Sequence, residues 1–132
     1  MSSSHRMTFT AGPEHIDVLG HVNNVVWVQW MEQIATAHWD AVSPPEHRER
    51  YVWMVVRHEG DYRGNIRLGE SVAAETFIPA GPTGARFVRH FRFTDAAGRA
   101  IVRAQTTWAL IDQATGKLAR VPPEVAAPFM DV

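Results

Sequence analysis

The chain has 132 residues, of which 45% are hydrophobic and 20% charged, and its formal net charge at pH 7 is −1. This composition predicts one globular domain over residues 1–132, large enough to bury a core without disulfides or bound metal. A protein that binds nucleic acid or membrane surfaces non-specifically needs a basic excess, so neither partner is expected.

Residue types that are missing restrict the possible chemistry. The absence of cysteine excludes a thiol nucleophile and thiolate metal ligands, and the histidines form no His-Glu-x-x-His pair. No metal and no cofactor is therefore expected. Ser43 and Ser71 lie in no Gly-x-Ser-x-Gly elbow, so hydrolysis would run through a carboxylate, a histidine or an activated water. Residues 1–7 lack a signal-peptide core and no apolar run could span a bilayer, which predicts a cytoplasmic location.

The first half of the chain predicts a strand and a long helix. Residues 5–11 are typical of a strand or its lead-in. Residues 22–40 predict one helix, because apolar side chains recur there at spacings of three and four. Those side chains are Trp27, Trp30, Met31, Ile34 and His38, and the polar stripe is Gln29, Gln33, Thr36 and Asp40. The sequence Ser43-Pro44-Pro45 ends the helix.

The second half predicts a meander of four strands after a polar link at residues 46–50. Residues 51–57 are almost continuously apolar, which is typical of a strand buried on both faces. Residues 71–79, 87–94 and 100–112 alternate in polarity, as strands with one buried face do. A short helix is expected from Pro122 onwards. The fold class is therefore α+β, with a long helix wrapped by a curved antiparallel sheet of about five strands.

The most informative stretch places an acidic residue before a glycine-bearing turn that runs into the long helix. It reads Asp17-Val-Leu-Gly20-His21-Val-Asn23-Asn24. The first N–H groups of a helix are unpaired and carry partial positive charge, so they can bind the oxyanion that forms when a carbonyl is attacked. Asp17 thus lies where a general base or nucleophile would stand, and this geometry favours hydrolysis of an acyl group.

This stretch also resembles the motif of hotdog-fold thioesterases of the 4-hydroxybenzoyl-CoA thioesterase type. The matching positions are Asp17, Gly20, His21, Val22, Asn23, Asn24, Trp27 and Glu32. Residues 62–70 are similar to the hairpin after the second strand of that family, and the resemblance spans roughly residues 5–128. It implies a hotdog fold, an acyl-CoA substrate and a homodimer or homotetramer with active sites at the dimer interface. Trp27 replaces a tyrosine that is usual in the family.

The resemblance implies catalytic roles for Asp17, His21 and Asn24. Asp17 would attack the thioester carbonyl or deprotonate the attacking water. His21 would brace the turn or protonate the leaving thiolate, and bracing is favoured because a thiol with a pKa of about 8.5 leaves readily. Asn24, or the residue before it, would supply a backbone N–H to the oxyanion. Glu32 would be a buried or interface partner for a histidine or arginine, with a direct role as the alternative.

Six residues are expected to contact substrate or to shape the site: Gly20, Asn23, Trp27, Met31, Glu32 and Arg89. Gly20 would let the carbonyl approach the turn, and Asn23 would orient that turn. Trp27 and Met31 belong either to the core or to the wall of an acyl tunnel. Arg89 is an ordinary surface charge by default, but it shares a strand face with two phenylalanines and is the first arginine to test for contact with the CoA phosphates.

Three functions follow from these patterns. The leading hypothesis is an acyl-CoA thioesterase acting as a homo-oligomer. The second is a thioesterase for acyl chains carried by an acyl-carrier protein. The third is a non-catalytic acyl-CoA-binding hotdog protein, in which Asp17 only caps the turn.

Overall fold

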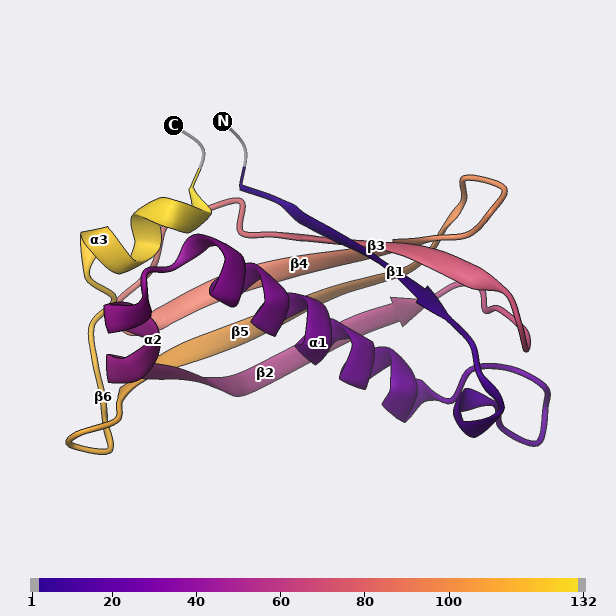
Figure 1. The fold of residues 1–132 in the computed structure, drawn as a ribbon, viewed down its shortest axis with the longest axis horizontal. Coiled ribbons are helices and arrows are strands. Elements are labelled where there is room, and N and C mark those ends of the chain that lie inside the picture. Colours follow the sequence, from indigo (N-terminus) through magenta and orange to yellow (C-terminus); the bar gives the residue numbers. More distant parts are fainter. Residues whose placement is uncertain (1–2, 131–132) are drawn as a thin grey trace.

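A computed structural model describes residues 3–130 and shows a long helix lying across the concave face of a curved antiparallel sheet (Figure 1). The helices are α1 (Asn24–Val42), α2 (Pro45–Arg50) and α3 (Pro123–Ala126). The strands are β1 (His5–Thr10), β2 (Tyr51–Tyr62), β3 (Ser71–Phe77), β4 (Arg86–Thr94), β5 (Ala100–Asp112) and β6 (Lys117–Leu118). Short 3-10 turns occupy Pro13–His15 and Ala127–Phe129.

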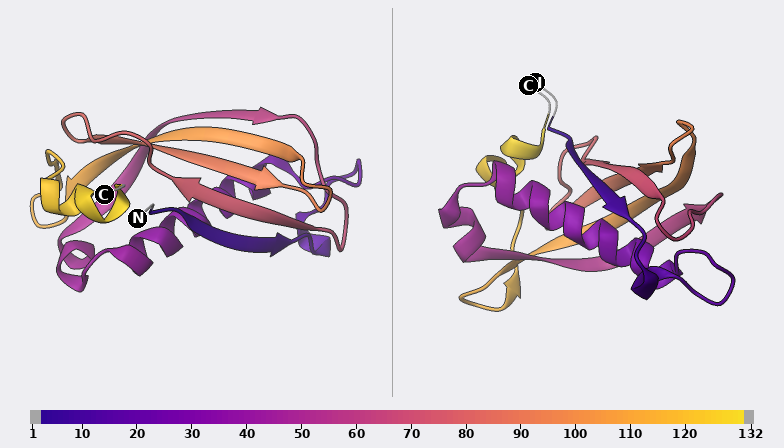
Figure 2. Two further views of the ribbon diagram at one scale, coloured as in Figure 1. Left: turned by 90° about the horizontal axis from the view of Figure 1, so that it is seen from above. Right: turned by 45° about the vertical axis from the view of Figure 1, so that its right-hand side comes forward.

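The strands form one sheet in the order β1-β3-β4-β5-β2, and the two-residue β6 pairs with β5. Every pairing is antiparallel. The expected simple meander is wrong at one point, because β2 lies beside β5 and not beside β3. Residues 63–70 therefore cross from one edge of the sheet towards the other, and β2 is left as an edge strand. The sheet curls around α1, as the views in Figure 2 show.

Helix α1 begins and ends where the local sequence predicts. The Asn23 side chain caps it by accepting a hydrogen bond from the N–H of Val25, and Ser43 ends it before Pro44. The predicted apolar stripe is buried, and it packs against aromatic side chains of the sheet. Trp27, for example, meets Phe93 edge to face at 5.1 Å between ring centroids. The buried residues of α1 are Val26, Trp27, Trp30, Met31, Ile34, Ala35 and His38.

Two elements differ from the sequence predictions. The polar link at residues 46–50 is helical, with Pro45 in the first turn, where a proline is tolerated because its missing N–H is not needed. Strand β2 is not buried on both faces of the protomer: Met54 is 48% exposed and Val55 is 41% exposed. The reason is its edge position, since β5 is its only neighbour in the sheet.

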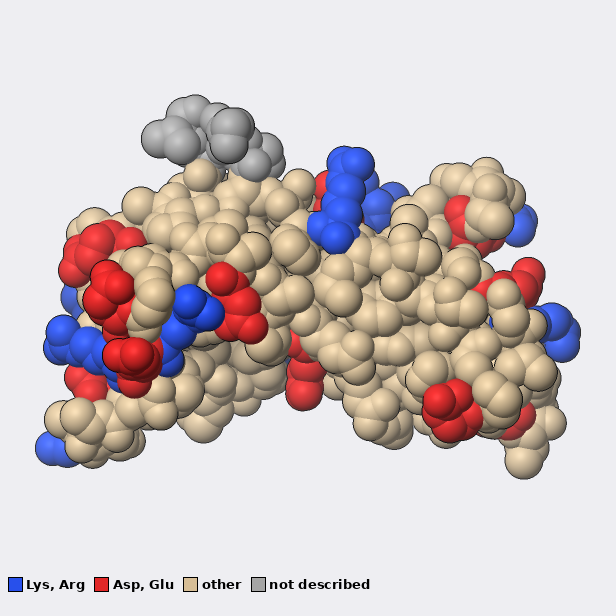
Figure 3. Space-filling model, in the orientation of Figure 1, with Lys and Arg blue, Asp and Glu red and all other residues tan. Residues whose placement is uncertain are grey.

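The surface carries charges of both signs. On the face shown in Figure 3, acidic and basic side chains intermingle around α2, and the middle of the face is largely without charge. Within residues 3–130, no helix is both long and apolar enough to cross a bilayer.

Candidate active site

The turn before α1 holds the carboxylate of Asp17 through backbone groups. Oδ1 of Asp17 accepts hydrogen bonds from the N–H groups of Leu19, at 2.9 Å, and His21, at 3.3 Å. The Asp17 N–H donates to the carbonyl oxygen of His21 at 2.8 Å. Oδ2 accepts no hydrogen bond from residues 3–130. Oδ1 of Asp17 is therefore held in place by the backbone, and Oδ2 is free to interact with a substrate or a water.

Gly20 adopts the left-handed conformation that the turn requires. Its φ is +78°, and its N–H donates to the Asp17 carbonyl at 3.0 Å. A Cβ at this position would lie 3.2 Å from Nη1 of Arg67 and would hold a conformation that side chains disfavour.

Most backbone N–H groups at the start of α1 have a hydrogen-bond acceptor, and the N–H of Asn24 is the exception among the described residues. The Asn23 N–H donates to the carbonyl of His15 at 3.0 Å, and the Val25 N–H donates to the Asn23 side chain. The N–H of Asn24 has no acceptor among residues 3–130. Of the two positions expected to bind an oxyanion, Asn24 is thus the one whose amide is available. It follows Asp17 by seven residues across the same turn.

Asn65 is a positioning residue that the sequence patterns did not single out. Its side chain accepts a hydrogen bond from the Val22 N–H at 3.0 Å and donates one to the Val22 carbonyl at 3.2 Å. This amide attaches the turn to the segment between β2 and β3. The available signal was its place in residues 62–70, the second stretch that resembles the family. The His21 ring forms no hydrogen bond within the described residues, so backbone groups and Asn65 brace the turn.

The remaining predicted residues of α1 lie apart from the turn. Trp27 and Met31 are buried in the core, with exposed fractions of 0% and 2%, so they belong to the packing between helix and sheet. Glu32 lies on the exposed side of α1 and forms no ion pair with residues 3–130. Glu32 was expected to be a buried or an interface partner of a histidine or arginine; it is exposed in the protomer because it falls outside the apolar stripe, so the interface role stays a prediction.

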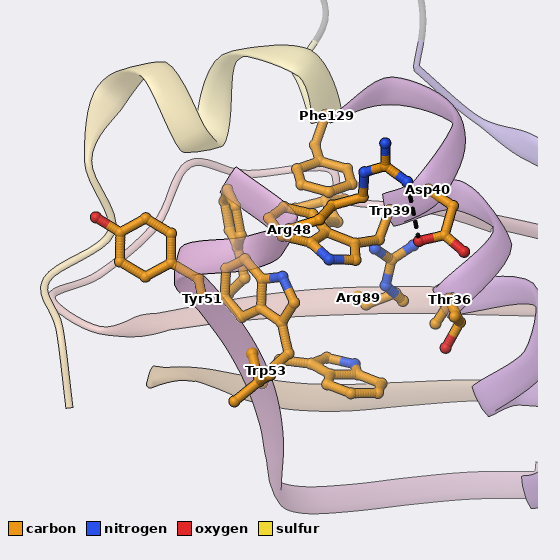
Figure 4. A pocket seen from close by; sticks show the side chains of 13 residues that line it. Thr36, Trp39, Asp40, Arg48, Tyr51, Trp53, Arg89 and Phe129 are labelled. Atoms are coloured by element: carbon orange, nitrogen blue, oxygen red, sulfur yellow. Dashed lines mark ion pairs between the residues drawn. The ribbon is translucent and has the colours of Figure 1, made fainter. Parts of the chain in front are cut away.

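A cavity of about 290 Å³ lies between the second half of α1 and the sheet (Figure 4). It begins near Ala35, roughly 17 Å along the helix from Asn24 at 1.5 Å per residue. Aromatic side chains from α1, β2, β4, β5 and the 3-10 turn at Ala127–Phe129 dominate its walls, and Arg89 and Arg48 also line it. The aromatic residues are Trp39, Tyr51, Trp53, Phe87, Trp108 and Phe129.

Arg89 of β4 is buried in this cavity wall, with only 5% of its surface exposed. Its Nη1 donates to Nδ1 of His38 at 2.9 Å and to Oγ1 of Thr76 at 3.1 Å. Its guanidinium carbon lies 5.4 Å from the centre of the Phe129 ring. Burial lowers the pKa of Arg89 to about 9, which still leaves it cationic at pH 7. The default reading of Arg89 as a surface charge is wrong, and its burial argues against contact with hydrated CoA phosphates.

His38 is the buried neutral partner of Arg89. Burial, the nearby Arg89 charge and, to a smaller extent, His5 lower the pKa of His38 from 6.5 to about 3. Because Arg89 donates to Nδ1, the ring proton lies on Nε2, 2.9 Å from the hydroxyl of Ser3. His38 is therefore a neutral hydrogen-bond acceptor for the guanidinium.

This arrangement predicts an acid-sensitive fold. Between pH 6.5 and about 3 the unfolded chain protonates His38 and the folded chain does not, so the free energy of unfolding falls as pH decreases. The contribution is at most about 1.4 kcal/mol per pH unit. Urea unfolding at pH 7 and pH 5 should show a smaller decrease for His38→Gln, which has no proton to bind, than for the unchanged protein. Equal decreases would contradict the assignment of a neutral His38.

Comparison with known proteins identifies the family. The model of the thioesterase-like superfamily matches residues 11–129, and the chain belongs to that superfamily. No curated protein matches the sequence. The antiparallel sheet curled around one helix is the hotdog fold, as the resemblance implied.

Three solved structures illustrate the likeness. The SAV2348 protein of Staphylococcus aureus, in complex with CoA, has a TM-score of 0.85 at 15% identity, over 97% of this chain and 82% of its own. A Thermus thermophilus thioesterase complexed with coenzyme A and zinc has a TM-score of 0.81 at 23% identity, over 95% and 90%. An acyl-ACP thioesterase of Bacteroides thetaiotaomicron has a TM-score of 0.79 at 21% identity, over 89% of this chain and 49% of its own. The chain thus spans about half the length of the Bacteroides enzyme.

Proposed function

We propose that the protein is an acyl-CoA thioesterase that hydrolyses a thioester to a free acid and CoA. The observation that carries this proposal is the turn itself, where an uncommitted carboxylate oxygen of Asp17 and the unpaired N–H of Asn24 occur on either side of Gly20. A base or nucleophile beside a helix N-terminus is what attack on an acyl carbonyl needs. Membership of the thioesterase-like superfamily and the CoA found in two structural relatives support the substrate class.

In this proposal Asp17 acts through Oδ2, while Oδ1 stays held by backbone N–H groups. As a base, Asp17 takes a proton from water, and the oxygen of that water bonds to the thioester carbon. As a nucleophile, it forms a mixed anhydride that water then hydrolyses. In both versions the carbonyl oxygen becomes an oxyanion that the Asn24 N–H stabilises. When the tetrahedral species collapses, the carbon–sulfur bond breaks and CoA leaves as a thiolate.

We further propose that the site is completed by a second copy of the chain, joined through β2. An unpaired edge strand offers hydrogen-bonding groups to a partner, and the exposed Met54 and Val55 lie on this edge. The Asp17 turn precedes the first residue of α1, whereas the cavity is lined by Ala35 and Trp39 in the second half of that helix. A twofold axis across antiparallel β2 strands would exchange these ends, so the turn of one protomer would reach the cavity end of the other. Val18 and Leu19, exposed at the turn, would gain cover there.

The assembly is expected to be at least dimeric. Light scattering at micromolar concentration should give a mass of at least twice 14.8 kDa. Val55→Lys should lower that mass and the thioesterase activity together, because it places a charge at the seam between the two sheets. Leu118→Lys on β6 is the matched control, since Leu118 is exposed but lies away from β2. A monomer that still hydrolyses thioesters would refute the shared site.

The function is tested by release of free thiol from a panel of acyl-CoAs, detected with a thiol reagent. The panel should cover short and long, straight, aromatic and carboxylate-ended acyl groups. Turnover of at least one acyl-CoA is expected. Turnover of acyl-carrier-protein thioesters but of no acyl-CoA would identify the protein as an acyl-carrier-protein thioesterase instead. Tight binding of acyl-CoA without any turnover would identify a binding protein instead.

A further inference from the structure

The cavity lined by Arg89 has the features of a site for an anionic group. We propose that it binds the far end of the acyl group, and that this end carries a carboxylate that pairs with Arg89. The preferred substrates would then be half-thioesters of short dicarboxylic acids. This inference rests on the proposed thioesterase function for the reaction, but the binding of the carboxylate can be tested separately.

Among residues 3–130 the charge on Arg89 has no counter-ion. Both of its hydrogen-bond acceptors, His38 and Thr76, are neutral, and it forms no ion pair within residues 3–130. A buried cation without a carboxylate partner destabilises the fold, because the cost of removing it from water is not offset by an ion pair. The other charges of the cavity do not cancel it, because the carboxylate of Asp40 faces Arg48 at 3.9 Å. The lining therefore keeps a net charge of +1, which favours an anionic ligand and disfavours a cationic one.

Some N–H donors of the Arg89 guanidinium have no acceptor among the described residues. Both protein acceptors of Arg89 are bound by the single nitrogen Nη1. The N–H groups on Nε and Nη2 have no acceptor among the described residues, yet these atoms are not fully enclosed by protein. Because Arg89 lines the cavity, its open side faces that space, as Figure 4 shows. Two donors on one planar guanidinium match the two oxygens of a carboxylate.

The walls around Arg89 limit what else the ligand contains. Trp39 and Trp53 stand edge to face at 5.8 Å, and Phe129 stacks on Trp39 at 5.9 Å. These apolar surfaces suit a short chain or a ring between the thioester and the carboxylate. The volume of about 290 Å³ is small for a ligand pocket, so it suits a short acyl group better than a long fatty acyl chain.

The selection of substrate follows from burial. A methyl end would offer the guanidinium neither charge nor an acceptor, whereas a carboxylate would supply both together. The thioester end would emerge at the cavity mouth, where the proposed pairing of β2 strands brings the Asp17 turn of the partner. Arg89 would thus be a specificity residue and take no part in bond breaking.

The kinetic test compares acyl-CoAs that differ only at the far end. Succinyl-CoA, glutaryl-CoA and adipoyl-CoA are paired with butyryl-CoA, pentanoyl-CoA and hexanoyl-CoA. For at least one pair, kcat/KM should favour the carboxylate, and Arg89→Met should reduce that preference by about 10- to 10²-fold. Arg99→Gln is the control, because Arg99 is an exposed arginine that pairs with Asp95 outside the cavity. If Arg89→Met does not fold, Arg89→Lys, which keeps the charge but loses the planar pair of donors, takes its place.

A binding measurement separates this inference from the proposed function. Glutarate and adipate should bind the intact protein in calorimetry more tightly than pentanoate and hexanoate, and the Arg89 variant should lose the difference. If these dicarboxylates bind but no acyl-CoA is hydrolysed, the result would support the anion site and contradict the proposed thioesterase function. Turnover with no preference for a carboxylate in either assay would overturn the anion site and leave the thioesterase intact. If the Arg89 variant loses activity or binding equally for carboxylate-ended and methyl-ended compounds, Arg89 would be a purely structural residue.

Discussion

Asp17→Asn is expected to lower kcat for acyl-CoA hydrolysis by at least about 10²-fold while leaving the melting temperature almost unchanged. An asparagine side chain has nearly the same shape, and its Oδ1 can still accept the N–H groups of Leu19 and His21 that hold the turn. What it lacks is the negative charge and basicity of the second oxygen. Loss of activity without loss of stability would therefore report on chemistry and not on folding.

The control for this variant is Glu32→Gln. Glu32 is the other carboxylate of the motif, but it lies exposed on α1 and has no ion-pair partner in the described part of the chain. Steady-state kinetics on both variants should show a large loss for Asp17 and a small one for Glu32. Near-normal turnover by Asp17→Asn, with a large loss for Glu32→Gln, would transfer the catalytic role to the helix carboxylate.

Gly20→Val is expected to lower kcat/KM by roughly 10²- to 10³-fold, the loss seen when an oxyanion donor is removed. A β-branched residue cannot hold a φ of +78° without strain, and its side chain would press on Arg67. The turn would shift, and the Asn24 N–H would no longer face the thioester carbonyl in the proposed site. The thermal shift of this variant must be measured with its kinetics.

His21→Ala is the comparison that fixes the role of the neighbouring ring. This ring forms no hydrogen bond within residues 3–130, and the backbone of His21 makes the contacts that hold Asp17. The alanine variant keeps that backbone and should retain most activity. If His21→Ala were as damaging as Asp17→Asn while Gly20→Val stayed active, the imidazole would be the proton donor to the leaving thiolate.

Local patterns predicted those parts of the fold that depend on local physics. The buried face of α1 and the alternating strands β3, β4 and β5 follow from periodicity, because one face of each element packs on a single core. Helix α2 was missed because six mostly charged residues show no apolar period. The burial of β2 was misjudged because an apolar run does not reveal whether a strand lies inside a sheet or at its edge.

In the candidate site too, features encoded by neighbouring residues were predictable from the sequence and long-range contacts were not. The Asp17 turn could be predicted because its residues are adjacent in the sequence and form a recognisable motif. Two long-range contacts could not be predicted: Asn65 contacts Val22 of the turn across 43 positions, and at the cavity Arg89 contacts His38 across 51. Such pairs depend on how the elements pack, and a buried arginine without a carboxylate has no sequence pattern of its own.

For the backbone of Val22, the planar side-chain amide of Asn65 takes the place of a neighbouring strand. Its oxygen and its nitrogen satisfy the N–H and the C=O of the same residue, as a strand in a sheet would. Aspartate at this position would lose the donor, leucine would lose both groups, and glutamine would be one methylene too long. The placement of the Asp17 turn, which we propose to be catalytic, thus depends on a side chain from the segment between β2 and β3, and almost no other residue type could replace Asn65 there.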